Sequence, residues 1–275
     1  MTPALPTLDW QVEALRAVLD GLWPGLQVQV VAEDGSTNAT LLERARAAPR
    51  EAAACLLVAE HQTAGRGRQG RAWHAARGDS LTFSLALPYA PADWAGLSLA
   101  VGVALADALD PAGAIGLKWP NDLWLRDPAP GPGRKLGGIL IETVAAAGGR
   151  LCVVGVGLNV RAHAFPGLET GHACLQELDP AASAPAVLHC VARPLLQALA
   201  RFEHEGFGAF AAGFARRDLL CGRSVTTTHA EVPSGQALGV QGDGALLLQD
   251  EAGRLHRVSA GEVSIRPRPA TQEAA

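Results

Sequence analysis

The spacing of hydrophobic residues predicts a large region of mixed helices and strands followed by a small region of strands. Apolar residues recur at helical intervals over residues 8–22 and 94–109, and again over 184–217, where the pattern fits two helices. Residues 54–60 form a continuous apolar run that is typical of a buried strand. After Cys221 the chain consists of short strand-like stretches joined by Gly/Asp turns. The pattern predicts an α/β (α+β) fold with a mixed sheet and a second, β-rich domain.

The change of pattern near residue 220 predicts the domain organisation. We expect one large domain over residues 1–220 and a small β domain over residues 221–268. The tail, residues 269–275, is expected to be disordered because it is polar and lies at a chain end.

Local signals predict how several of these elements begin and connect. The stretch GSTNATLLERARAA predicts a helix with Ser36 or Thr37 as its N-cap and Thr40 with Glu43 as a capping box. KLGGILIETVA and LCVVGVGLNV flank a glycine-rich turn and predict a β-hairpin. IGLKWPNDLWL predicts a strand that is broken at Pro120.

Composition narrows the class of protein. The net charge is −4 and 48% of the residues are hydrophobic, which argues for a globular core and against a surface that binds nucleic acid throughout. The five cysteines are odd in number and none are spaced as CxxC, which favours free thiols in a reducing compartment. The first ten residues lack a basic segment followed by an apolar one, so no signal peptide is expected. Together these features predict a cytoplasmic location.

Lysine is scarce in this chain. Of 23 basic residues only Lys118 and Lys135 are lysines, and Asn38, Asn121 and Asn159 are the three asparagines. The abundance of Ala, Gly and Arg indicates a coding bias that replaces lysine by arginine wherever either will serve. The two lysines are then candidates for positions where a compact ammonium group is needed.

Arginines and glycines alternate in TAGRGRQGR, residues 63–71, which we call the Gly/Arg loop. Its glycines match GxGxxG, but the loop leads into a strand, whereas the dinucleotide-binding fingerprint must open a helix. Glycines let the backbone approach an anion, and arginines donate to carboxylate or phosphate oxygens. The loop therefore predicts an anion site that is mobile when empty, and a solvated basic turn is the alternative.

Four further motifs are candidates for a site, each with a structural alternative. KWPND places Asn121 and Asp122 at a strand end, or forms an ordinary turn. RKLGG places Lys135 at the start of an apolar strand where Gly137 and Gly138 leave room for a flat ligand, or Lys135 is an ordinary surface lysine. The glycines of GVGLNV allow a ligand or another backbone to approach a buried strand closely, or they mark a bend in that strand. GSTN presents polar groups at a helix start, or caps the helix. The eight histidines show no metal-binding spacing, and no GxSxG motif indicates a nucleophilic hydrolase.

Taken in order, these motifs resemble those of the biotin protein ligases over residues 30–266. The resemblance implies a mixed-sheet catalytic domain of the biotin ligase/lipoate ligase type followed by a small SH3-like β-barrel. It implies a reaction in which biotin and MgATP give biotinyl-5′-AMP and pyrophosphate. A lysine of a biotin carboxyl carrier protein then takes the biotinyl group and AMP leaves. Biotin, ATP and Mg²⁺ are the implied substrates and cofactors.

The resemblance also implies a role for each matching residue. The implied biotin-binding residues are Ser36, Thr37, Asn38, Gln62, Arg66, Gly67, Arg68 and Lys135. The implied nucleotide-binding residues are Arg71, Trp73, Lys118, Asn121 and Asn159. The implied catalytic residues are Lys135, Arg68 and Asp122, with Asp122 as the base of the second step. No protein cluster is expected to hold the metal, which would enter with ATP. Gln69 and Gly138 depart from the family pattern, and Gln69 lacks a charge that some relatives carry.

The resemblance is to the short form of the family. Only one helix and one strand fit before GSTN, so we expect no DNA-binding domain and no DNA partner. The expected partner is the biotin carboxyl carrier domain of acetyl-CoA carboxylase or a related carboxylase, without a membrane, and a homodimer is compatible with the sequence. Two alternatives stay open: a lipoate or octanoate ligase on the same fold, and an anion-sensing protein without catalysis.

Overall fold

The computed structural model describes residues 8–127, 131, 133–146, 149–163, 172–260 and 265–267 of the chain. Its residues group into two compact units. Unit 1 comprises Met1–Tyr89, Ile141–Gly167 and Cys174–Leu196, and unit 2 comprises Ala90–Leu140, Leu168–Ala173 and Gln197–Ala275. Strand β6 (Arg134–Ala146) and helix α4 (Ala184–Glu205) each run through both units. The larger sheet has the hydrogen-bonded order β1-β2-β3-β7-β6-β5-β4.

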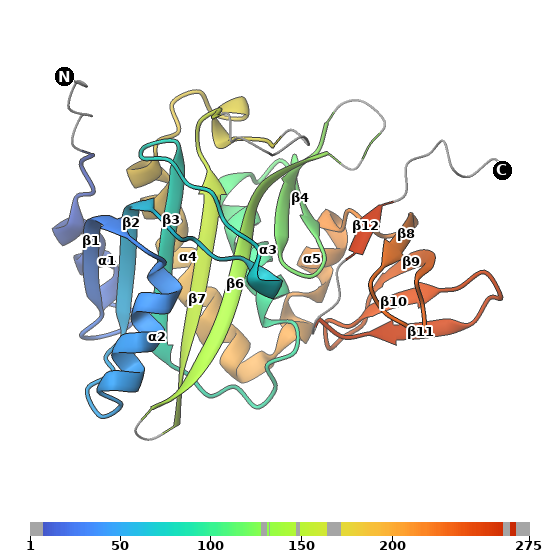
Figure 1. Cartoon of the computed structure of the whole chain (residues 1–275), viewed down its shortest axis with the longest axis horizontal. Coiled ribbons are helices and arrows are strands. Elements are labelled where there is room, and N and C mark those ends of the chain that lie inside the picture. The colour runs from blue at the N-terminus through green and yellow to red at the C-terminus, as the bar shows by residue number, and fades with distance from the viewer. Residues whose placement is uncertain are drawn as a thin grey trace. The chain divides into compact units, whose positions relative to one another are not determined.

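Unit 1 contains four of these strands and two helices before α4. Its strands are β1 (Gln27–Asp34), β2 (Cys55–Gln62), β3 (Ser80–Pro88) and β7 (Gly149–Asn159), and its helices are α1 (Val12–Asp20) and α2 (Thr37–Ala47). Strands β1 and β2 are parallel, whereas β3 is antiparallel to both β2 and β7, so the predicted mixed sheet is confirmed. Helix α1 packs on β1, and α2 packs on β2, β3 and β7 (Figure 1).

The core of unit 1 explains why β2 and β3 are buried along most of their length. Leu41 and Leu42 of α2 pack against Leu57 of β2 and Val153 of β7, and all four side chains are buried. Helices cover the sheet, so strand positions on both sides are removed from water. A polar side chain on these strands must therefore find a partner inside the protein.

The start of α2 differs from the sequence-based expectation in one respect. Ser36 occupies the N-cap position, but its side chain makes no capping hydrogen bond. The predicted capping box is wrong, because the helix already begins at Thr37, so Thr40 lies inside it, and its hydroxyl donates to Asp34 Oδ1 at 2.9 Å. Asp34 also accepts the Ser36 backbone N–H at 2.7 Å, so this carboxylate at the end of β1 takes over the role of the cap.

Unit 2 holds the remaining strands of the larger sheet. Helix α3 (Leu97–Leu109) precedes β4 (Ile115–Lys118) and β5 (Asp122–Leu125). The latter two strands form an antiparallel hairpin around a cis Trp119–Pro120 peptide bond, so Pro120 reverses the chain and does not merely break a strand. Strand β5 is in turn antiparallel to β6.

A buried arginine connects the helices of unit 2 to this hairpin. Arg217 ends α5 (Ala211–Arg217) and is only 6% exposed. Its guanidinium donates to the Asp107 carboxylate at 2.8 Å and to the carbonyls of Ile115 and Asp110 at 2.8 and 2.6 Å. Each of the three guanidinium nitrogens has an acceptor, and the Asp107 carboxylate compensates the buried charge. Helix α5 is thereby fixed against the start of β4.

The C-terminal part of unit 2 is a five-stranded antiparallel sheet of order β11-β10-β9-β8-β12. Its strands are β8 (Ser224–Thr227), β9 (Ser234–Val240), β10 (Leu246–Gln249), β11 (Leu255–Val258) and β12 (Ile265–Pro267). The predicted β-rich texture after Cys221 is confirmed. The domain boundary at residue 220 stays a prediction, and the predicted tail lies outside the described residues.

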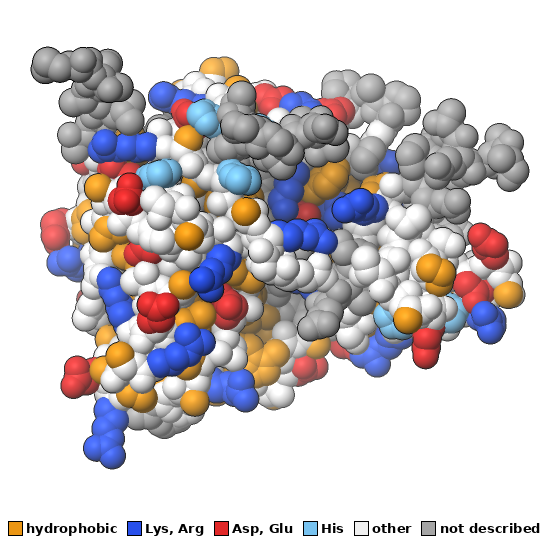
Figure 2. Space-filling model, viewed as in Figure 1, with side chains coloured by type: hydrophobic (Ala, Val, Ile, Leu, Met, Phe, Trp, Pro, Cys, Tyr) orange, Lys and Arg blue, Asp and Glu red, His pale blue; other side chains and the backbone are white. Residues whose placement is uncertain are grey.

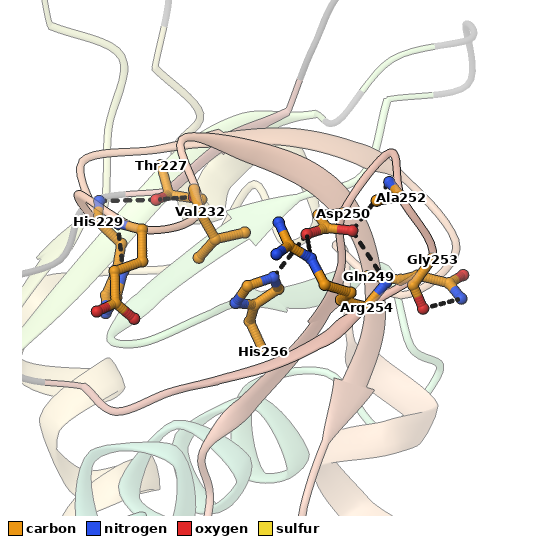
Figure 3. Close-up of polar contacts among 10 residues, drawn as sticks. Thr227, His229, Val232, Gln249, Asp250, Ala252, Gly253, Arg254 and His256 are labelled. Atoms are coloured by element: carbon orange, nitrogen blue, oxygen red, sulfur yellow. Dashed lines mark hydrogen bonds and ion pairs between the residues drawn. The ribbon is translucent and has the colours of Figure 1, made fainter.

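One carboxylate organises the turn between β10 and β11 (Figure 3). Asp250 accepts the backbone N–H groups of Ala252 and Arg254, each at 2.9 Å. His256 Nε2 lies 2.8 Å from the same carboxylate, and Arg254 Nε donates to it at 2.9 Å. The His256 contact and the Arg254 bonds hold the pKa of Asp250 well below its ordinary value. This cluster is a structural staple of the turn.

No described helix combines the length and apolar character that crossing a bilayer requires. On the face that Figure 2 shows, acidic and basic side chains are interspersed. The surface seen there gives no field of a single sign, in keeping with the net charge of −4.

The five cysteines carry free thiols, and their environments predict their reactivity. Burial raises the pKa of Cys152 to about 12 and raises the pKa of Cys55 as well, whereas Cys190 and Cys221 are exposed. Because the thiolate is the reactive form, a raised pKa slows alkylation at a given pH. We expect iodoacetamide at pH 8 to label Cys221 first. Cys190 should follow more slowly, because partial burial raises its pKa. Cys55, Cys152 and Cys174 should react only after unfolding. Peptide mass spectrometry over time measures this order, and early labelling of Cys152 would contradict it.

Candidate functional site

The Gly/Arg loop folds into a short hairpin in unit 1. Gly67 N–H donates to the Arg71 carbonyl at 2.7 Å, and Trp73 N–H donates to the Gly65 carbonyl at 2.9 Å. Gln69 and Gly70 make the turn with φ angles of +58° and +69°. The left-handed conformation suits glycine and is tolerated at a single polar residue. Backbone bonds thus give the loop a defined shape, and its predicted mobility stays a prediction.

Trp73 anchors this hairpin to β7. A Cβ atom at Gly157 would collide with the Trp73 ring, so the ring lies directly on the glycine backbone. The indole Nε1 is buried and finds no hydrogen-bond acceptor among the described residues. A buried N–H without a partner costs about 1–3 kcal/mol, which an acceptor on a bound molecule would remove. Part of the space that the GVGLNV glycines provide is therefore filled by the chain's own side chain.

The start of α2 brings three predicted residues together in unit 1. Thr37 N–H donates to Gln62 Oε1 at 2.8 Å, and the Thr37 hydroxyl lies 2.6 Å from the hydroxyl of Ser84. Ser84 donates to Asn38 Oδ1 at 2.6 Å, and Asn38 Nδ2 donates to Glu142 Oε2 at 2.9 Å. Sequence reasoning missed Ser84 and Glu142. The available signal for Ser84 was a polar residue within the otherwise apolar stretch FSLAL.

Asp122 forms ion pairs with both lysines of the chain in unit 2. Lys135 Nζ lies 2.8 Å from Asp122 Oδ1, and Lys118 Nζ lies 3.7 Å from Asp122 Oδ2. The side chain of Asp122 is 15% exposed and that of Lys118 is 10% exposed, whereas Lys135 reaches 41%. The two lysines that composition singled out therefore share one carboxylate.

A β-bulge gives Lys135 its direction. Between β5 and β6 the register changes, so that Leu123 pairs with Gly137 but Trp124 pairs with Lys135. Without the extra residue, the buried Leu136 would stand opposite Trp124. The bulge places Lys135 on the face of the sheet that carries Asp122.

Neighbouring groups hold the KWPND turn in place. Asn121 donates from Nδ2 to the Ile139 carbonyl at 2.9 Å and accepts the Ile139 N–H on its own carbonyl at 2.9 Å. Trp119 is fully buried, and its indole N–H donates to the Gly244 carbonyl at 3.0 Å. The Lys118 ammonium lies 5.4 Å from the centre of the Trp124 ring.

The predicted residues fall into two groups, one in each unit. Unit 1 holds Ser36, Thr37, Asn38, Gln62, Arg66, Gly67, Arg68, Arg71, Trp73 and Asn159. Unit 2 holds Lys118, Asn121, Asp122 and Lys135. Of the three predicted catalytic residues, Lys135 and Asp122 are in contact and Arg68 belongs to unit 1.

Five of the predicted residues are cationic, namely Arg66, Arg68, Arg71, Lys118 and Lys135. Such donors bind anions and stabilise charge that develops on phosphate or carboxylate oxygens. Within the described residues no group of three or more His, Cys, Asp or Glu side chains could hold a metal ion. The cationic residues of each unit suit the binding of an anion.

Comparisons with known proteins identify the family. The model of the biotin/lipoate A/B protein ligase family matches residues 32–159, and the model of the biotin protein ligase C-terminal domain matches residues 220–266. A Mycobacterium tuberculosis protein named biotin--[acetyl-CoA-carboxylase] ligase is 37% identical over 274 residues, covering 94% of this chain and 96% of that protein. The chain belongs to the biotin protein ligase family.

Two further relatives extend the likeness to this family. The bifunctional ligase/repressor BirA of Escherichia coli is 34% identical, over 90% of this chain and 76% of that protein. The structure resembles that of the Aquifex aeolicus biotin protein ligase in complex with biotin and ATP, with a TM-score of 0.72 and 27% identity. The match covers 88% of this chain and 99% of that chain. The fold expected from the motifs is confirmed.

The contact between Trp73 and Gly157 generates a test of how the Gly/Arg loop is anchored. Gly157→Ala should displace the Trp73 ring and loosen the hairpin, because the new methyl group would occupy the same space. We expect trypsin to cleave several-fold faster at Arg66, Arg68 or Arg71. Gly242→Ala is the matched control, since a Cβ at Gly242 meets no atom within 4 Å. Equal cleavage of both variants and the unaltered protein would show that Trp73 does not hold the loop.

Proposed function

We propose that this chain is an ATP-dependent ligase that activates biotin as biotinyl-5′-AMP and transfers it to a lysine of a biotin carboxyl carrier protein. The similarity to the M. tuberculosis biotin--[acetyl-CoA-carboxylase] ligase along 94% of this chain is the observation that carries the proposal. The complexes of related ligases with biotin and ATP favour biotin over lipoate as the substrate. The acceptor would belong to acetyl-CoA carboxylase or a related carboxylase in the cytoplasm.

The reaction has two steps in which no bond to the enzyme forms. A carboxylate oxygen of biotin attacks the α-phosphorus of ATP, and the bond from that phosphorus to the bridging oxygen breaks, so that pyrophosphate leaves. The amine of the acceptor lysine then attacks the acyl carbon, the bond to AMP breaks, and the amine loses a proton. The absence of a nucleophile motif from the sequence is in keeping with this route.

Repulsion between two anions is the main obstacle in the first step. A cation beside the reacting groups offsets this repulsion and stabilises the charge that grows on the phosphate. Lys135, Arg66 and Arg68 are proposed for this task. The ion pair with Asp122 supports the role of Lys135, because it gives the flexible lysine chain a fixed direction. Asp122 is also our candidate to receive the proton in the second step.

The residues of unit 1 are proposed to bind the head group of biotin and the nucleotide. Ser36, Thr37, Asn38 and Gln62 would bind the head group of biotin, with Gly67 offering backbone contacts. Arg71, Trp73 and Asn159 would contact the nucleotide, together with Lys118 and Asn121 of unit 2. The buried indole N–H of Trp73 supports its role, since a ligand oxygen would give it an acceptor.

Magnesium is proposed to arrive with ATP as part of the substrate. The described residues offer no cluster of metal-ligating side chains. Mg²⁺ commonly keeps several waters and is held largely by substrate phosphates. This chain would then bind the metal through the phosphates that its cations recognise.

Pyrophosphate release is the direct test of the proposed function. The unaltered protein with ATP and Mg²⁺ should release pyrophosphate when biotin is added and should label a purified carrier domain on one lysine, as seen by mass spectrometry. Lipoate or octanoate in place of biotin should give neither result. Release with lipoate but not with biotin would assign the chain to the other branch of the family, and binding of anions without release would favour a sensor.

Replacing Lys135 by arginine tests whether lysine is required there. The charge is kept, but a guanidinium is wide, planar and fixed in its donor directions, whereas an ammonium acts as a compact point charge. We expect pyrophosphate release to slow by about 10²-fold, since misplacement by about an ångström can have that effect. Stopped assays of pyrophosphate release, followed by transfer to the carrier domain, measure both steps.

Lys118→Arg is the matched control, because it alters the only other lysine of the sequence, and that lysine pairs with the same carboxylate. Its effect should be milder if Lys118 mainly supports the Trp–Pro turn. Near-normal rates for Lys135→Arg in both steps would mean that lysine survives at position 135 by chance.

A further inference from the structure

Five polar side chains of unit 1 form one continuous chain of hydrogen bonds beneath the start of α2. Gln62, Thr37, Ser84, Asn38 and Glu142 follow one another: the Thr37 hydroxyl lies 3.1 Å from Gln62 Oε1, and the three remaining side-chain contacts are between 2.6 and 2.9 Å. Thr37, Asn38 and Ser84 are 3%, 4% and 0% exposed. Three of the five belong to the proposed biotin site, whereas Ser84 and Glu142 have no role in it.

Removal from water makes this chain of contacts more than a packing detail. A buried hydroxyl or amide without a partner is costly, so each member constrains the orientation of the next. Gly155 stands opposite Ser84 on β7, and a Cβ there would collide with the Asn38 amide. Backbone and side chains thus leave the Asn38 amide one narrow space beside Ser84.

The donor and the acceptor of each hydrogen bond in this series follow from the carboxylate of Glu142 at one end. An ionised carboxylate only accepts, so Glu142 fixes Nδ2 of Asn38 toward itself and turns Oδ1 toward Ser84. An amide oxygen only accepts, so the single Ser84 proton goes to Asn38. In the 2.6 Å contact between the two hydroxyls, Thr37 must then be the donor.

At the other end of this series of hydrogen bonds, the backbone fixes the orientation of Gln62. Gln62 Oε1 accepts the Thr37 N–H at 2.8 Å and lies 3.1 Å from the Thr37 hydroxyl, which can share its proton with it only weakly. The Gln62 amide therefore turns its Nε2 toward Gly65, at the base of the Gly/Arg loop. Thr37 offers a bound molecule an acceptor oxygen, and Gln62 offers N–H donors.

We infer that Ser84 and Glu142 are positioning residues that set this order of donors and acceptors and so make the site selective for a cyclic urea. The inference rests on the proposed function. A urea ring carries both N–H donors and a carbonyl acceptor, which match the Thr37 oxygen and the Gln62 amide. A dithiolane ring has neither, so it would leave both groups unpaired. Sites built to hydrogen-bond a ligand reject analogues that lack the partner groups.

Calorimetric titration of the full-length chain with biotin, and separately with ATP, tests this role. Ser84→Ala and Glu142→Ala should each raise the Kd for biotin by about tenfold or more, because Thr37 and Asn38 lose their fixed orientation. Binding of ATP should change by less than about twofold. Desthiobiotin keeps the urea and should lose affinity in the same proportion as biotin, so the preference of the site for ureas over lipoate should shrink.

Two further variants separate positioning from packing. Thr82→Val is the matched control: Thr82 lies two residues from Ser84 on β3 and is 2% exposed, but its hydroxyl bonds the Ala59 carbonyl outside the chain of contacts. It should bind biotin normally. Glu142→Gln keeps an acceptor for Asn38 and should restore affinity to within about threefold of the unaltered protein.

The outcomes distinguish the inference from the function beneath it. Unchanged biotin binding by folded Ser84→Ala and Glu142→Ala would overturn the inference alone, as would an equal loss in Thr82→Val. If Ser84→Ala does not fold, the half-buried Glu142 variants decide the matter. Absence of biotin binding by the unaltered chain would overturn the proposed function, and the inference would fall with it.

Discussion

A single carboxylate with two ammonium partners is the constraint on which the second group of site residues depends. Lys118 and Lys135 carry like charges, and only an anion between them allows both to remain in a partly buried place. The hairpin of β4 and β5 supplies this anion at the first residue after its turn, and the bulge in β6 turns Lys135 toward it. Asp122 thereby holds two ammonium groups beside one carboxylate in unit 2.

Sequence reasoning singled out the residues that are in contact in unit 2 but did not show how they meet. The scarcity of lysine marked both positions, and KWPND marked the carboxylate between them. Nothing in the pattern of residues indicated the bulge at Leu136 of β6, because it depends on how β6 pairs with β5, and the sequence of one strand does not show that pairing. Likewise, Pro120 indicated that the strand is interrupted. It did not show that the chain reverses there, because the reversal depends on the pairing of β5 with β6.

In unit 1 the limits of prediction were set by long-range contacts. The helix after Ser36 and the buried strands were predictable, because each depends on local periodicity. The capping box failed because the helix begins at Thr37, before Thr40, and the Thr40 hydroxyl bonds Asp34 of the preceding strand. Ser84 and Glu142 were invisible for the same reason: the Asn38 amide that joins them is 46 residues from one and 104 residues from the other.

The hydrogen bond from Trp119 to Gly244 has a consequence for how the protein is made. The two residues are 125 positions apart, and Gly244 lies in the turn between two strands of the C-terminal sheet. During synthesis from the N-terminus, the KWPND turn emerges from the ribosome long before the carbonyl that completes its support. The turn gains this hydrogen bond only after Gly244 has been made. A chain that ends before Gly244 therefore lacks this support of the KWPND turn in unit 2.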